Sequence, residues 1–261
     1  MTNTNHMQSA SQRGVVFFRN QHNLTDALQK DFVHRMGVQT GKPASSTLHV
    51  HPTINNTSEF GTTDAEISVI SSDARKKFDK APPGAPRESR KYGAAQWHSD
   101  IQFEEHPADY TSLRLVKLPI TGGDTLWASG YELYDRFSKP YQKFFEGLTA
   151  TFSGEGFLQL VKAGKATLYD KPRGSPNNVG DHLTAVHPIV RTNPVTGWKS
   201  IFAVGPFPKQ IIELSKEESD GVLAQLKQAV VEQHDLQVRF KWKNVNDIGE
   251  CGRSVLLSAF R

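Results

Sequence analysis

The amino-acid sequence predicts a mainly β protein with a few helices, folded as an antiparallel sandwich or barrel. Short segments rich in β-branched and aromatic residues recur along the chain, and turn residues separate them. This spacing is typical of antiparallel architectures with many short strands. No internal repeat or compositional break divides the chain, so we expect a single domain over residues 1–261. The predicted strands span residues 15–18, 66–70, 112–118, 125–128, 148–152, 185–190, 200–204 and 238–242.

Helical patterns interrupt these strands in two places. Ser215 and Glu218 form a capping box, in which each side chain satisfies a backbone amide of the other residue. The apolar residues that follow recur at helical spacing and predict one buried face, formed by Val222, Leu223, Leu226, Ala229 and Val230. A second helix is expected over residues 130–137, and Pro140 is expected to begin a further helical turn.

Composition and charge narrow the classes of function. No apolar run is long enough to cross a bilayer, and residues 1–13 lack the apolar segment of a secretory signal. The single cysteine, Cys251, allows no intrachain disulfide, which fits a reducing compartment, and we expect a cytoplasmic protein. The net charge of +4 comes mostly from dispersed basic residues, so we expect neither a nucleic-acid nor a membrane partner. The composition leaves open whether the protein forms a homo-oligomer.

The tripeptide His98-Ser99-Asp100 is the strongest functional signal in the chain. Side chains two residues apart on a strand point to the same face, so this imidazole and this carboxylate can reach one metal ion. One more histidine would complete the 2-His-1-carboxylate arrangement that holds Fe(II) in non-haem oxygenases. Because a histidine and an aspartate at this spacing also occur by chance as a surface pair, the surrounding sequence decides between the two interpretations.

Several further motifs accompany this tripeptide in a fixed order. They are GVVFFR (14–19), LHVHPT (48–53), WHSD (97–100), GGDTLWA (122–128), HPIVRT (187–192), VRFKW (238–242) and NDI (246–248). Together they resemble the taurine dioxygenase and 2,4-dichlorophenoxyacetate dioxygenase family of Fe(II)- and 2-oxoglutarate-dependent enzymes, and most closely its fungal sulfonate dioxygenase branch. The resemblance implies a double-stranded β-helix, or jelly roll, whose rigid barrel carries the metal ligands.

The resemblance also implies roles for individual residues. His98 and Asp100 would bind the iron, and the hydroxyl of Thr125 would help to hold the carboxylate of 2-oxoglutarate. His51 matches a histidine that contacts the anionic group of the substrate. Two aromatic residues would wall the pocket, Trp97 and Trp127.

The implied reaction uses dioxygen to hydroxylate a small anionic substrate. With an alkylsulfonate, hydroxylation next to the sulfonate gives an unstable adduct that releases sulfite. Ile54 stands where taurine dioxygenase has a tyrosine, and Ala94 stands where it has an asparagine. We therefore expect a sulfonate other than taurine.

The sequence departs from the family after residues 246–248. There the family continues to a distal iron-binding histidine and two arginines, whereas here Leu257 falls at the histidine position, Arg253 stays in register and Arg261 is the last residue. We expect a jelly roll that is incomplete at its C-terminal end and lacks the last part of the catalytic core. The chain would then be a truncated product, a natural pseudoenzyme, or an enzyme that recruits another histidine. The nearest candidates are His187 and His182.

The sequence thus predicts a 2-oxoglutarate-dependent sulfonate dioxygenase, with the activity of the chain as written left open. The alternative is an inactive truncated homologue that acts as a binding or interaction module. A hydrolase is disfavoured, because the chain has no Gly-x-Ser-x-Gly elbow, no His-Glu-x-x-His motif and no phosphate-binding glycine loop.

Overall fold

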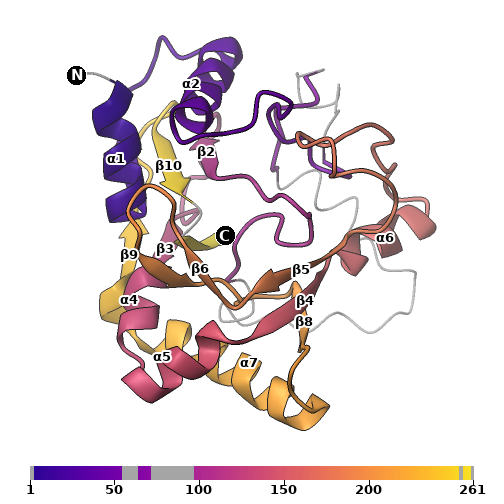
Figure 1. Cartoon of the computed structure of the whole chain (residues 1–261). Coiled ribbons are helices and arrows are strands. Elements are labelled where there is room, and N and C mark those ends of the chain that lie inside the picture. Colours follow the sequence, from indigo (N-terminus) through magenta and orange to yellow (C-terminus); the bar gives the residue numbers. More distant parts are fainter. Residues whose placement is uncertain (1–2, 55–63, 72–96, 253–254, 260–261) are drawn as a thin grey trace.

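The computed structural model of the chain describes residues 3–54, 64–71, 97–252 and 255–259 (Figure 1). The described strands pair in small antiparallel sheets with the orders β1-β10-β2, β11-β3-β9, β5-β4-β8 and β6-β7. The strands are β1 (Val15–Phe18), β2 (Tyr110–Arg114), β3 (Thr125–Ser129), β4 (Thr149–Ser153), β5 (Thr184–Pro188), β6 (Val190–Thr192), β7 (Lys199–Ile201), β8 (Pro208–Ile211), β9 (Gln237–Phe240), β10 (Ile248–Gly252) and β11 (Val255–Ala259).

Sheet pairing joins segments that are far apart in the sequence. In the first sheet, Gly249 of β10 lies opposite both Phe17 of β1 and Leu113 of β2. In the second sheet, Trp127 of β3 lies opposite Val238 of β9 and Leu257 of β11. The prediction of a mainly β protein with helices is confirmed.

The individual strand predictions are confirmed only in part. Residues 66–70 form no strand, because this segment follows a turn on the surface. There Lys30 holds Asp64 and Glu66 at 2.6 and 2.8 Å, and Ile70 is 82% exposed. A strand needs a hydrogen-bonding neighbour, and an apolar pattern does not supply one. The other seven predicted strands overlap observed ones. Those at 15–18, 125–128, 148–152 and 238–242 match β1, β3, β4 and β9 closely, and those at 112–118, 185–190 and 200–204 overlap β2, β5 and β7 with shifted ends.

The helices pack around the sheets, and the predicted capping box is present in the longest of them. The Ser215 hydroxyl accepts from the Glu218 amide at 3.3 Å, and the Glu218 carboxylate accepts from the Ser215 amide at 2.9 Å. Ser129 and Ser138 are the N-caps of the two other predicted helices. The helices are α1 (Asn3–Arg13), α2 (Asp26–Gln39), α4 (Gly130–Asp135), α5 (Lys139–Glu146), α6 (Glu155–Lys162), α7 (Lys216–Glu232) and the 3-10 helix η3 (His234–Leu236).

The main hydrophobic core lies where the sheet of β4, β5 and β8 meets α4, α5 and α7 (Figure 1). Phe145 of α5, Phe152 of β4, and Leu226 and Val230 of α7 are all fully buried there. The predicted apolar stripe of α7 is therefore core packing. A second cluster, formed by Trp127, Phe240 and Trp242, lies against the sheet of β3 and β9.

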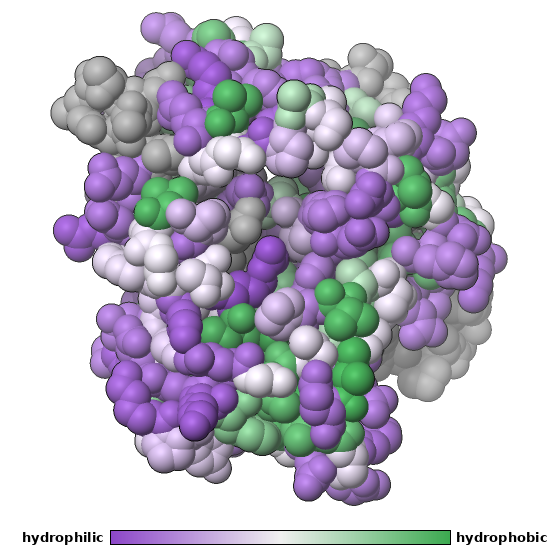
Figure 2. Space-filling view, viewed as in Figure 1, coloured by the Kyte–Doolittle hydropathy of each residue, from purple (hydrophilic) through white to green (hydrophobic). Residues whose placement is uncertain are grey.

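The surface is mixed in character. Figure 2 shows hydrophobic side chains gathered on the lower half of one face, over the region where Figure 1 draws β4 and β8, whereas the upper half is mostly hydrophilic. Within the described part of the chain, no helix combines the length and the apolar character that crossing a membrane requires.

Candidate functional site

His98 and Asp100 lie side by side, as their spacing predicts. Nε2 of His98 is 3.3 Å from Oδ1 of Asp100, and the two side chains are 29% and 37% exposed. The residues that alternate with them, Trp97 and Ser99, are buried. The period of two along the chain therefore turns the imidazole and the carboxylate to one side, while Trp97 anchors the segment in the main core.

Gly205 brings the segment after β7 against the backbone of this motif. Its φ is +116°, a conformation that favours glycine. A Cβ atom on Gly205 would lie 2.7 Å from the carbonyl oxygen of Trp97 and 3.0 Å from Cα of His98. Two residues later, the ring of Phe207 stands edge-on to the His98 ring, with centroids 6.3 Å apart. Residues 205–207 thus limit how far His98 can move.

Three histidines act electrostatically on Asp100. Burial raises the pKa of its carboxyl, but the hydrogen bond from His98 and the electrostatic effects of the His98, His51 and His49 imidazoles outweigh burial and leave the pKa below its ordinary value. Asp100 is therefore ionised at neutral pH, which is the state that a metal ligand needs.

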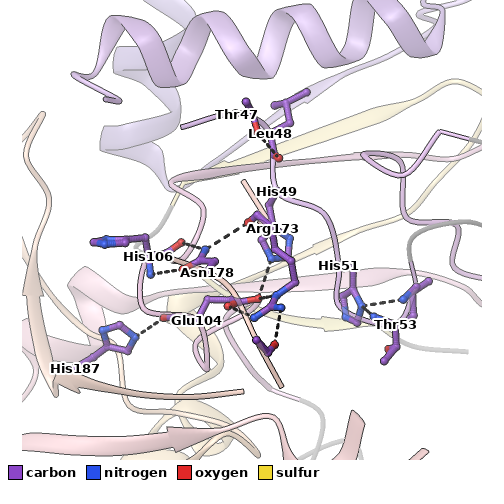
Figure 3. A network of polar contacts seen from close by, with 12 residues as sticks. Thr47, Leu48, His49, His51, Thr53, Glu104, His106, Arg173, Asn178 and His187 are labelled. Carbon is purple, nitrogen blue, oxygen red and sulfur yellow. Dashed lines mark hydrogen bonds and ion pairs between the residues drawn. The ribbon is translucent and has the colours of Figure 1, made fainter. Parts of the chain in front are cut away.

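His51 is held as a neutral imidazole. Its Nδ1 accepts hydrogen bonds from the amides of Thr53 at 3.1 Å and Ile54 at 3.0 Å (Figure 3). The ring also lies edge-on to Phe157, with centroids 4.8 Å apart. Burial is the main reason that the pKa of His51 falls to about 4, so at neutral pH the ring carries its single proton on Nε2.

Thr125 lies at the start of β3, in the second core cluster. It is 3% exposed, and its hydroxyl accepts a hydrogen bond from the indole of Trp242 at 3.0 Å. Trp127 is 2% exposed and packs in the same cluster, beside Cys251. Burial raises the pKa of the Cys251 thiol, and the negative charge of Asp100 raises it further. Asp100 is therefore near enough to the second core cluster for its charge to act on Cys251.

A buried ion pair between Glu104 and Arg173 lies close to His51 (Figure 3). Nε of Arg173 donates to Oε1 of Glu104 at 2.5 Å, and Nη2 donates to Oε2 at 3.0 Å. The two side chains are 2% and 1% exposed. No local pattern in the sequence predicts this pair, because its members are 69 residues apart.

Neither alternative histidine joins His98 and Asp100. The ring of His187 is buried between Phe152 and Phe202, and its Nε2 hydrogen-bonds the main-chain oxygen of Glu104 at 2.9 Å. The side chain of His182 is 96% exposed. The described residues contain no group of three histidine, cysteine, aspartate or glutamate side chains that could hold a metal ion.

Comparison with known proteins identifies the family. The sequence model described as "Taurine catabolism dioxygenase TauD, TfdA family" matches residues 3–248. The chain belongs to this family. One relative, the alpha-ketoglutarate-dependent dioxygenase btcD of Neocamarosporium betae, is 46% identical over 250 residues, which cover 92% of this chain and 70% of the relative.

A further relative and a solved structure extend the comparison. The alpha-ketoglutarate-dependent sulfonate dioxygenase of Saccharomyces cerevisiae is 31% identical over 236 residues, covering 89% of this chain, and the chain spans 50% of that enzyme. A taurine dioxygenase structure from Burkholderia xenovorans has a TM-score of 0.67 at 22% identity, covering 99% of this chain and 73% of that one. The expected resemblance and the jelly-roll fold are confirmed.

Fe(II) and 2-oxoglutarate are the metal and the co-substrate of the TauD/TfdA family. The adjacent imidazole of His98 and ionised carboxylate of Asp100 fit two of the three protein ligands of such an iron. Leu257, at the expected position of the distal histidine, pairs with Trp127 across β11 and β3, and a leucine side chain cannot bind a metal. The residues Ala94, Arg253 and Arg261 lie outside the described part of the chain.

Proposed function

We propose that this protein is an Fe(II)- and 2-oxoglutarate-dependent dioxygenase that hydroxylates a small organic acid, with an alkylsulfonate as its substrate. The observation that carries the proposal is the approach of His98 and Asp100 to 3.3 Å on a segment anchored by buried neighbours. Two sulfonate dioxygenases among the relatives, at 34% and 31% identity, support the choice of substrate class.

Separate residues of the chain would bind the metal and the co-substrate. His98 and Asp100 would hold Fe(II), and the hydroxyl of Thr125 would donate a hydrogen bond to a carboxylate oxygen of 2-oxoglutarate while it accepts one from Trp242. When bound, the metal and its co-substrate supply the oxidation of a C–H bond by dioxygen. The protein orients the reactants and excludes water.

His51 would contact the anionic group of the substrate. A neutral imidazole with its proton on Nε2 is a hydrogen-bond donor, and a sulfonate oxygen is an acceptor. Because burial holds the pKa of His51 near 4, this donor keeps the same protonation state across the neutral pH range. Such a contact recognises the anion through an oriented hydrogen bond and not through an opposite charge.

An anaerobic titration with Fe(II) and 2-oxoglutarate tests the proposal. Chelation of the metal by 2-oxoglutarate gives a visible charge-transfer band, and we expect a saturable band that His98→Ala abolishes. His182→Ala is the matched control, since that histidine is 96% exposed, and it should leave the band unchanged. With dioxygen and an alkylsulfonate, succinate and sulfite should form in equal amounts. A folded protein that gives no band would contradict the proposal.

A further inference from the structure

Three segments of the chain meet at the buried ion pair of Glu104 and Arg173 (Figure 3). Glu104 follows Asp100 by four residues, and the intervening residues 101–103 are buried. The second segment, residues 47–52, carries His51. The third is the loop between α6 and β5, residues 163–183, which carries Arg173 and is called the Arg173 loop. The pair therefore links the segment that carries the proposed metal ligands to the Arg173 loop and, through His49, to the segment that carries the proposed substrate contact.

The geometry of the pair makes it rigid. The guanidinium and the carboxylate form two parallel hydrogen bonds at 2.5 and 3.0 Å, an arrangement that fixes both side chains in direction as well as in distance. Nη1 of Arg173 also donates to the carbonyl oxygen of Gly180 at 3.0 Å. Two charges buried to this degree stabilise a fold only when such partners are all present.

The Arg173 loop also lies directly on the backbone of the His51 segment. The amide of Thr47 donates to the carbonyl oxygen of Gly174 at 2.8 Å, and the amide of Tyr169 donates to the carbonyl oxygen of Pro52 at 2.8 Å. Gly174 has a φ of +90°, and a Cβ atom there would lie 2.9 Å from Cα of His49. The loop therefore holds residues 47–52 by backbone contacts on both sides of the two histidines.

His49 connects this segment to the ion pair itself. Its Nε2 lies 3.5 Å from Oε1 of Glu104, the oxygen that also accepts from Nε of Arg173. Burial raises the pKa of Glu104, but the hydrogen bonds from His49 and Arg173 outweigh it and leave the pKa below its ordinary value. One ionised carboxylate thus contacts both the Arg173 loop and the residue two positions before His51.

We propose that Glu104 and Arg173 are positioning residues that fix His51 relative to the His98 and Asp100 pair. The proposal rests on the proposed function, because it assigns the ion pair to the same site. Without the pair, residues 47–52 lose the contact of His49 with Glu104 and the support of the Arg173 loop. His51 then samples several positions, and an anionic substrate loses its oriented donor, while the metal pair stays in place.

The double variant Glu104→Met/Arg173→Met tests this role. It replaces both charges by apolar side chains of similar length, so no single buried charge is left unpaired. The matched control is Arg136→Met/Asp235→Met, which removes an ion pair with two hydrogen bonds at 2.7 and 2.8 Å on the exposed surface. Arg173→Lys, which keeps the charge but not the paired hydrogen bonds, gives a second test if the double variant does not fold.

Two measurements separate the inference from the proposed function. In the metal-free protein, the amides of Thr53 and Ile54 report whether His51 holds its position, and we expect their hydrogen exchange to accelerate about tenfold or more in the double variant. In the protein loaded with Fe(II) and 2-oxoglutarate, the dissociation constant of pentanesulfonate, read from its effect on the charge-transfer band, should rise about tenfold or more. The band itself should persist.

The outcomes are distinct. Unchanged exchange at Thr53 and Ile54 in a folded variant, or an unchanged dissociation constant for pentanesulfonate, overturns the positioning role. An equal effect in the control variant also overturns it. A wild-type protein that gives no band contradicts the proposed function, and the exchange measurement then still decides whether the pair holds His51.

Discussion

Glu250 of β10 lies opposite Ser112 of β2, and the Ser112 side chain hydrogen-bonds its buried carboxyl. Glu250 is 3% exposed, and its Oε2 has no hydrogen-bond partner among the described residues. Burial raises the pKa of Glu250 to about 8. The hydrogen bond from Ser112 lowers the pKa, but by less than burial raises it. The carboxyl is therefore mostly neutral in the folded protein at pH 7, whereas it is ionised in the unfolded chain.

The titration of Glu250 should make stability fall as the pH rises from 4.5 to about 8. Because folding raises its pKa from 4.5 to about 8, its stabilising contribution is complete below pH 4.5 and is lost as the pH rises through about 8. Glu250→Gln should therefore be more stable than the wild type at pH 8.5, by up to about 5 kcal/mol, with a small difference at pH 5. Urea unfolding at both pH values measures this. Glu217→Gln, at an exposed position of α7, is the control, and equal pH dependence of the two variants would contradict the prediction.

The close packing of Gly205 on the metal motif should couple stability to metal binding. Gly205→Ala forces a Cβ atom against Trp97 and His98, so we expect a loss of about 1–3 kcal/mol in unfolding free energy and weaker Co(II) binding. Gly164→Ala is the matched control, since its φ of +67° is also positive but no atom lies within 4 Å. It should cost about 1 kcal/mol through backbone strain alone and leave Co(II) binding unchanged. Calorimetric titration and chemical denaturation compare the two variants.

The N-terminus of α7 should depend on its serine cap. Ser215→Ala removes the acceptor of the Glu218 amide, and we expect a loss of about 1 kcal/mol in unfolding free energy. Ser138 is the N-cap of α5 but makes no side-chain capping hydrogen bond. Ser138→Ala should therefore cost clearly less, and equal losses in denaturant unfolding would show that the capping bond contributes nothing.

The buried face of α7 should contribute most of the stability of that helix. Leu226 is fully buried in the main core, so Leu226→Ala should lower the unfolding free energy by about 2–5 kcal/mol, through lost burial and the cavity left behind. Leu28, on α2, is 51% exposed, and Leu28→Ala should change stability by less than about 1 kcal/mol. A similar shift of the thermal midpoint in both variants would be inconsistent with this packing.

The features predicted correctly from sequence depend on neighbours along the chain. The capping box of Ser215 and Glu218 involves residues three apart. The common orientation of His98 and Asp100 follows from the alternation of buried and partly exposed side chains over residues 97–100, where the chain enters a turn. The resemblance added the family, the jelly roll, Fe(II) and 2-oxoglutarate. The assignments of Thr125 and His51 to 2-oxoglutarate and substrate stay predictions.

Strands with an unfavourable composition escaped prediction. β10 contains two glycines and a glutamate in five residues, which are depleted in strands, yet it is the central strand of its sheet. Its partners β1 and β2 supply the hydrogen bonds on both sides. Conversely, residues 66–70 have a suitable composition and no strand partner in the described structure.

By itself, the sequence determined the class of fold through its recurring short strand segments, and the family through the resemblance of its motifs. It also determined the pairing of His98 with Asp100, because residues two apart in the chain are constrained by backbone geometry. Only the tertiary structure decided that Glu104 meets Arg173, that Gly205 packs on His98 and that Glu250 is buried without a full set of partners. These contacts join distant segments, and they arise from the packing of the whole core rather than from any local pattern.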